Sequence, residues 1–183
     1  PQQARTTKAR AVASGDVADE VQALGRKAHA FKVDVSKAEE VKAMVDFAVD
    51  RLGTLNGMFN NAGIGLVKPF LEMEPADYLK VIEVDQHSVY YGLLYGARKM
   101  VELGAKGAFV NTASIYGSIA ARGSFNYNAA KAAVVSMSRS GALELAEHGI
   151  RVVAVAPASS TRRSWAMIPR SRRPWPRSIC TTG

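Results

Sequence analysis

The sequence predicts a doubly wound α/β fold: a mostly parallel sheet with helices on both faces, incomplete at both ends. Strand-like and helix-like segments alternate four times along the chain. The predicted strands are near-continuous apolar runs, which is typical of parallel strands covered on both faces. The 183 residues are enough for one domain with a sizeable core and too few for two. We therefore expect one partial domain over residues 15–157.

The predicted helices are marked by the residues at their ends. Asp16 and Asp19 suit the positive end of a helix dipole, and Gly25 ends that first helix. Ser36 followed by Glu39 has the form of a capping box, which predicts a helix start. Together with apolar periodicity, these signals predict helices from about 16 to 24 and over 37–51, 75–103 and 127–147.

The predicted strands are the short apolar runs between these helices, 28–33, 55–60, 107–112 and 150–156, and a further short strand is expected near 9–13. In such a sheet the ligand-binding loops follow the carboxyl ends of the strands. Residues 60–63, Asn-Asn-Ala-Gly, leave one strand, and their small side chains let a backbone approach a flat ligand. Ser114 follows the next strand.

Composition excludes several classes of protein. No apolar run approaches the ~18 residues of a membrane span, and no secretory leader is visible. The single cysteine, Cys180, agrees with a reducing compartment, so we expect a cytoplasmic protein. The net charge is +8, but nine of the 24 bases lie in the acid-free segments 1–14 and 162–183, which leaves 15 bases and 16 acids between them. A basic nucleic-acid-binding face is therefore not expected.

Tyr127, Lys131 and Ser114 form a constellation that can carry chemistry. The four-residue step from Tyr127 to Lys131 puts phenol and ammonium on one helix face, one turn apart. The ammonium favours the phenolate, so Tyr127 can act as a general acid or base. The Ser114 hydroxyl can hydrogen-bond a substrate oxygen. A Tyr-Lys pair alone is usually a surface pair, but here it follows residues 60–63 and precedes a strand closing on Pro157.

This order of motifs resembles the short-chain dehydrogenase/reductase family from about Gly15 to Pro157. The resemblance implies a Rossmann-like fold and hydride transfer between the nicotinamide of NAD or NADP and a secondary alcohol or ketone. It implies catalytic roles for Ser114, Tyr127 and Lys131, and a supporting role for Asp85, which stands where the family usually has Asn. The cofactor-binding residues that it implies are Asp34, Val35, Asn60, Ala62, Gly63, Tyr127, Lys131 and Pro157.

The resemblance also implies a homodimer or homotetramer that pairs the helices at 75–103 and 127–147, with no nucleic-acid or membrane partner. Besides Asp85, two further features depart from the family. The glycine-rich turn T-G-x-x-x-G-x-G is absent from residues 1–27, and Pro157 is followed by Ala158 in place of Gly. We expect an irregular segment over 1–14 and a basic, unstructured tail over 158–183, both translated out of frame or truncated around a genuine dehydrogenase middle.

Two alternatives to an active enzyme remain open. The first is a remnant of such a dehydrogenase that does not bind cofactor and is either inactive or acts through protein contacts. The second is a nucleic-acid binder that uses the basic ends. The three histidines, His29, His87 and His148, lie far apart in the sequence without the spacing of metal ligands, so no metal site is expected.

Overall fold

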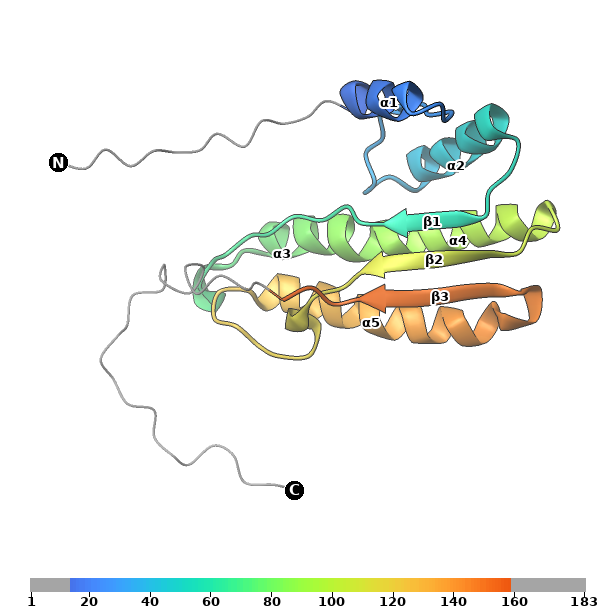
Figure 1. The fold of residues 1–183 in the computed structure, drawn as a ribbon. Helices are drawn as coiled ribbons and strands as arrows, with labels where there is room; N and C mark the ends of the chain where they lie inside the picture. Colours follow the sequence, from blue (N-terminus) through green and yellow to red (C-terminus); the bar gives the residue numbers. More distant parts are fainter. Residues whose placement is uncertain (1–13, 159–183) are drawn as a thin grey trace.

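The computed structural model describes residues 14–158, in which five helices and three strands follow one another along the chain (Figure 1). The helices are α1 (Ser14–Ala23), α2 (Ala38–Leu52), α3 (Pro75–Ile82), α4 (Ser88–Glu102) and α5 (Phe125–Glu144). The strands are β1 (Gly57–Asn60), β2 (Gly107–Thr112) and β3 (Ile150–Val155). Short helical turns are η1 (Phe70–Glu72), η2 (Glu83–His87), η3 (Ile115–Gly117) and η4 (Ala146–His148).

The three strands form one parallel sheet in the order β1-β2-β3. Asn60 at the end of β1 lies opposite Asn111, and Asn111 lies opposite Ala154. All three carboxyl ends therefore point to the same edge of the sheet (Figure 1). The structure confirms the expected parallel α/β class, with an incomplete sheet.

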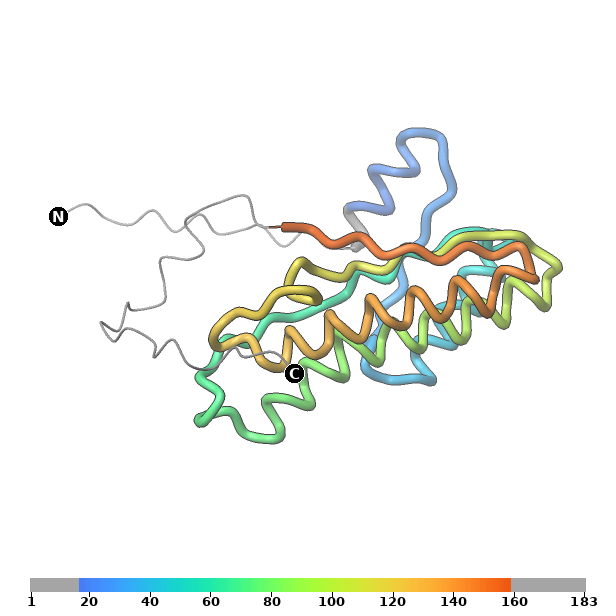
Figure 2. Tube along the Cα trace, turned by 90° about the horizontal axis from the view of Figure 1, so that it is seen from below, coloured from blue at the N-terminus to red at the C-terminus, as the bar shows by residue number. Residues whose placement is uncertain are grey.

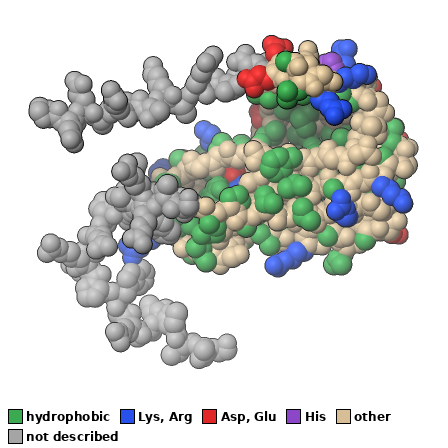
Figure 3. All heavy atoms as spheres, in the orientation of Figure 1, with side chains coloured by type: hydrophobic (Ala, Val, Ile, Leu, Met, Phe, Trp, Pro, Cys, Tyr) green, Lys and Arg blue, Asp and Glu red, His purple; other side chains and the backbone are tan. Residues whose placement is uncertain are grey.

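Helices lie on both sides of the sheet, but unequally. Figure 2 shows α4 and α5 along one face, with α1 on the opposite side. On the face away from α4 and α5, Phe59 is 61% exposed and Val153 is 50% exposed. That face is turned toward the reader in Figure 3, where hydrophobic side chains gather on it. Burial of the strands is therefore one-sided within the described residues.

The core lies between the sheet and α4 and α5. Phe109 on β2 is fully buried against Met100 of α4. Close contact between α4 and the sheet depends on Gly96, since a Cβ there would lie 2.8 Å from the Phe109 ring. A second cluster, Val81, Ile82 and Ala130, joins α3 to α5 beneath the carboxyl edge of the sheet. This cluster holds the first turns of α5 in place.

Three expectations about local structure prove wrong. The run 28–33 forms no strand in the described part of the chain, and its Phe31 packs on Phe47 of α2 instead, with ring centroids 4.9 Å apart. The capping box is also wrong, because the N-cap of α2 is Lys37 and lacks a side-chain cap. The Ser36 hydroxyl donates to Asp34 Oδ1 at 2.7 Å and so closes a local turn.

The third is the uninterrupted helix expected over 75–103. It is divided by η2, one wide π-helical turn between α3 and α4. The expected strand near 9–13 and the tail from residue 159 onward lie outside the described residues.

Candidate active site

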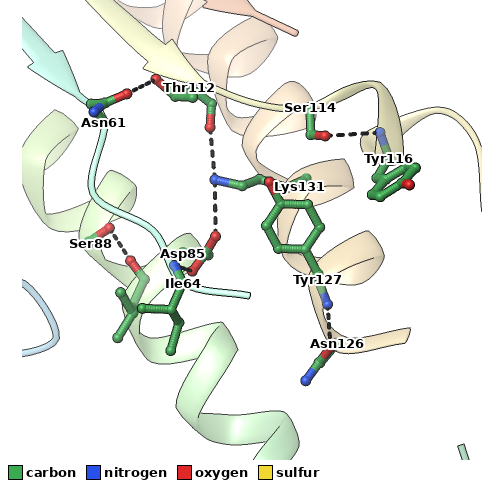
Figure 4. A network of polar contacts seen from close by, with 11 residues as sticks. Asn61, Ile64, Asp85, Ser88, Thr112, Ser114, Tyr116, Asn126, Tyr127 and Lys131 are labelled. Atoms are coloured by element: carbon green, nitrogen blue, oxygen red, sulfur yellow. Dashed lines mark hydrogen bonds and ion pairs between the residues drawn. The ribbon is translucent and has the colours of Figure 1, made fainter. Parts of the chain in front are cut away.

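The expected chemical residues gather at the carboxyl edge of the sheet. Ser114 follows β2 and begins η3, and the first two turns of α5 carry Tyr127 and Lys131. The expected helix across 127–131 is confirmed. Figure 4 shows these three side chains beside the loop that leaves β1. Residues separated by as much as 70 positions are thereby brought to one edge.

Lys131 is the most enclosed group of the site. Its side chain is 3% exposed. Its Nζ donates to the Thr112 carbonyl at 3.0 Å and lies 5.4 Å from the centroid of the Tyr127 ring. A buried ammonium is unfavourable unless it is paired and hydrogen-bonded. Here the backbone of β2 and the ring face supply part of that compensation.

Asp85 supplies the counter-charge. It lies in η2 and is fully buried, with Oδ2 3.1 Å from Lys131 Nζ. This contact is an ion pair without the direction of a hydrogen bond, since Oδ2 has no hydrogen-bond partner. The other oxygen, Oδ1, accepts from the backbone N–H of Ile64 at 2.7 Å. Asp85 therefore lies between Lys131 and Ile64 and links the lysine to the loop after β1 (Figure 4).

Tyr127 and Ser114 are both half-buried. The Tyr127 ring meets the Tyr116 ring edge-on, with centroids 6.2 Å apart. Ser114 Oγ accepts from the backbone N–H of Tyr116 at 3.2 Å. That bond occupies a lone pair of the hydroxyl and leaves its hydrogen to donate to a ligand. The site thus offers a phenol, a hydroxyl donor and an ammonium at one edge.

A polar network beneath the site was not foreseen from the sequence. The Asn60 side chain donates to Asn111 Oδ1 at 2.8 Å, and Asn111 donates to Ser138 Oγ of α5 at 2.9 Å. Ser138 in turn donates to the Val134 carbonyl. These bonds tie β1, β2 and α5 together. The available signal was an Asn inside an apolar strand, because a buried amide needs partners.

The expected cofactor-binding residues divide into two groups. Gly63 adjoins the site, since a Cβ there would lie 2.9 Å from Asp85 Oδ2 and 3.4 Å from Lys131 Nζ. The carbonyl of Pro157 accepts from Ile115 N–H at 3.3 Å, beside Ser114. Asp34 instead belongs to the exposed turn before α2. Hydrogen bonds from the hydroxyl and backbone N–H of Ser36 lower the pKa of Asp34.

The residues around Lys131 fit the nicotinamide end of a dinucleotide. Gly63 leaves backbone uncovered beside the lysine. Lys131 Nζ donates one hydrogen bond, to the Thr112 carbonyl, and so keeps N–H capacity for a ligand. The Asn60 side chain is turned toward β2 and α4: it donates to Asn111, and a Cβ at Gly92 would clash with its Oδ1.

Residues 14–158 hold no cluster of three His, Cys, Asp or Glu side chains able to bind a metal ion. Over the same residues, no helix has the length and apolar character needed to cross a bilayer.

Comparison with known proteins agrees with this geometry. The family model for short chain dehydrogenases matches residues 4–166. Cyclohexanol dehydrogenase of Acinetobacter sp. (strain SE19) is 41% identical over 146 residues, which cover 79% of this chain and 58% of that protein. Zerumbone synthase of Zingiber zerumbet is 39% identical over 167 residues, covering 85% of this chain and 62% of that protein.

Solved structures give the same relation. A short chain dehydrogenase from Mycobacterium smegmatis matches with a TM-score of 0.76 at 33% identity, covering 78% of this chain and 60% of that one. The chain thus spans about three fifths of the length of the relatives that it matches.

Proposed function

The chain belongs to the short chain dehydrogenase family, and from this we propose that it is an NAD(P)-dependent oxidoreductase acting on a secondary alcohol or ketone. The observation that supports the proposal best is the placement of Lys131. The lysine is buried, held by Thr112 and Asp85, and lies 5.4 Å from the centre of the Tyr127 ring. A surface Tyr-Lys pair would need none of this compensation.

The chemistry follows from the groups at the site. A nicotinamide dinucleotide, when bound, accepts or supplies the hydride. In the direction of alcohol oxidation, the Tyr127 oxygen takes the hydroxyl proton, and the Ser114 hydroxyl donates a hydrogen bond to the same substrate oxygen. The Lys131 ammonium lies 5.4 Å from the centre of the Tyr127 ring, where it attracts negative charge that forms on the site oxygens during the transfer. In the reverse direction, Tyr127 returns the proton to the carbonyl oxygen.

Apolar residues packed with Tyr127, and exposed apolar residues of the neighbouring loops, favour an apolar substrate. Leu66 and Tyr78 pack in the same cluster as Tyr127. Val67 is 76% exposed, and Ile119 of the loop after η3 is also exposed. An apolar alcohol fits such surroundings better than a charged one. Cyclohexanol, named for a relative of this chain, is therefore a suitable probe.

The test is the substitution Tyr127→Phe. We expect cyclohexanol turnover to fall by about 100-fold or more, since proton transfer by a positioned side chain contributes roughly that much. Binding of NADH and NADPH, followed by fluorescence, should stay within about twofold of the unsubstituted chain, because the ring and its packing are kept. Tyr90→Phe, on the exposed side of α4, is the matched control. Near-normal turnover of Tyr127→Phe would refute the assigned role.

The second candidate is a remnant that does not hold cofactor. It is favoured by the sequence of residues 1–27, which contains no glycine-rich turn of the kind that seats a pyrophosphate. The same fluorescence titration decides between the candidates. Saturable binding of either dinucleotide supports the enzyme, and no binding at millimolar concentrations supports the remnant.

We further propose a homodimer or homotetramer formed through α4 and α5. A groove of 590 Å³ between these helices has an apolar lining that includes Leu94, Ala97 and Met137. Arg98 on α4 and Glu144 on α5 border it with opposite charges, which two copies related by a two-fold axis can pair. Val101→Glu, at an exposed position of the same groove, should then reduce the molar mass measured by light scattering, whereas an oligomer of unchanged mass contradicts this interface. We also propose a cytoplasmic location, since a single cysteine agrees with a reducing compartment.

A further inference from the structure

A small pocket lies where η1, the start of α3 and the start of α5 meet. Its volume is 280 Å³, and it is lined by Phe70, Met73, Glu74, Pro75, Tyr78 and Phe125. Pockets that hold drug-sized ligands usually have about 300–1,000 Å³, so a ligand of this pocket would be smaller. None of Ser114, Tyr127 and Lys131 lines it, and the pocket is therefore separate from the candidate active site.

Three aromatic rings form one wall of this pocket. The ring centroids of Phe70 and Phe125 are 4.7 Å apart, and those of Tyr78 and Phe125 are 6.2 Å apart. Neighbouring rings are tilted by 45° and 47°, so the wall curves round the pocket. Phe70 and Phe125 are nevertheless 61% and 52% exposed. Large rings that remain in solvent gain little from packing, and a ligand that covers them would bury apolar surface.

The backbone around the pocket is held by contacts between distant segments. The N–H of Lys68 donates to the Gly123 carbonyl at 2.9 Å, and Lys68 Nζ pairs with Asp77 Oδ2 at 2.6 Å. The Asn126 side chain donates to the Asp77 carbonyl at 3.3 Å. These contacts tie the segment before Phe70 to α3 and to α5. The rings are therefore arranged before a ligand binds, which lowers the entropic cost of binding.

The charge at the pocket is negative. Glu74 is the charged residue of the lining, and Glu72 lies close by in η1. The nearby Lys68 is already paired with Asp77. An anionic ligand is therefore disfavoured. A hard metal ion needs about six or more oxygen ligands, and no cluster able to bind a metal ion is present in residues 14–158.

We propose that this pocket binds a small organic cation of the quaternary ammonium class. Aromatic rings attract a cation through their negative faces, and several rings round one pocket are the usual site for methylated ammonium groups. The Met73 thioether would add a polarisable contact, and the Glu74 carboxylate would balance the charge. This inference goes beyond the proposed function and does not rest on it.

The experiment titrates the full chain, without NADH or NADPH, with choline and with the neutral tert-butyl analogue of choline. The analogue has the shape of choline, but a carbon atom replaces the charged nitrogen. Affinities are measured by isothermal titration calorimetry for the unsubstituted chain and for Phe70→Leu, Phe125→Leu and Glu74→Gln. Phe59→Leu is the matched control, because Phe59 on β1 is also 61% exposed and lies outside the pocket.

Choline should bind about tenfold more tightly than its neutral analogue, because the rings and the carboxylate favour the charge. Phe70→Leu and Phe125→Leu keep an apolar side chain but remove an aromatic face. Each should weaken choline binding about fivefold and change binding of the analogue by less than about twofold. Glu74→Gln should weaken binding of choline alone, and Phe59→Leu should change neither affinity.

The melting temperature separates a loss of binding from a loss of folding. Because Phe70 is largely exposed, Phe70→Leu should melt as the unsubstituted chain does. A weaker affinity of this variant for choline is then an effect on the pocket itself.

Three results would overturn the inference: no saturable binding of choline at millimolar concentrations, equal affinities for choline and its analogue, or an affinity for choline that both phenylalanine substitutions in the pocket leave unchanged. Equal affinities would mean that the pocket is only an apolar surface. An unchanged affinity would mean that choline binds elsewhere. Failure to bind NADH or NADPH would refute the proposed function instead, and the choline titration does not depend on it.

Discussion

Asn111 is the best position for testing the internal structure of the site. Its side chain is fully buried, accepts from Asn60 at 2.8 Å and donates to Ser138 at 2.9 Å. Asn111→Ala removes both bonds and leaves a buried donor on Asn60 without a partner. At about 1 kcal/mol for each bond, with a further 1–3 kcal/mol for an unsatisfied group, the free energy of unfolding should fall by about 3 kcal/mol.

The measurement is urea unfolding of the full chain followed by far-UV circular dichroism. With a slope of roughly 2 kcal/mol per molar urea, the midpoint should fall by about 1.5 M. Ser138→Ala is the control, because it removes only the link to α5; it leaves the fully buried Asn111 amide donor without that acceptor, so it should cost about 2 kcal/mol. A loss below about 1 kcal/mol for Asn111→Ala, or an equal loss for both variants, would refute the network as a cross-link between sheet and helix.

The remaining predictions concern an ion pair and two glycines. The hydrogen bond from Lys68 holds the pKa of Asp77 below its ordinary value of 3.8, so this pair stabilises the fold above the unfolded pKa and is lost as pH falls through the folded pKa. Asp77→Asn should therefore lower the melting temperature at pH 7 and flatten its decline below about pH 4. Gly96→Ala should destabilise, because its Cβ would lie 2.8 Å from the Phe109 ring. Gly141→Ala on α5 should stabilise by up to about 1 kcal/mol in the same urea assay, since its Cβ would make ordinary contacts at 3.6 Å; equal effects at the two glycines would contradict the packing.

Local signals in the sequence were sufficient where an element depends on its own residues. The strand predicted at 107–112 has those same bounds in the structure, and the helix around Tyr127 and Lys131 begins two residues before Tyr127. Gly104 ends the preceding helix, and Gly107 begins the apolar run of the strand, so few other positions for this strand are possible. The contact between Lys131 and the carboxyl end of β2 follows from the parallel order of the strands.

Signals failed where an element depends on distant partners. The run 28–33 has the composition of a strand, but a strand also needs a neighbour, and none pairs with it in residues 14–158. Ser36 had two local options, and the turn with Asp34 prevailed over the predicted cap. The bond between Asn111 and Ser138 joins residues 27 apart, which periodicity does not address.

The wide turn at η2 determines how the two halves of the long helix face their neighbours. Val81, Asp85 and Val89 are all buried, although steps of four residues drift round a regular α-helix by about 40° each. The wider π-helical turn reduces this drift and keeps the carboxylate on the inner side. Deleting one residue there would close the turn to regular α-helical geometry and remove the extra residue by which the turn keeps the carboxylate of Asp85 on the inner side. Sequence length in this turn is therefore as constrained as residue identity, and a one-codon deletion at 83–87 should be less tolerated than most single substitutions in the same segment.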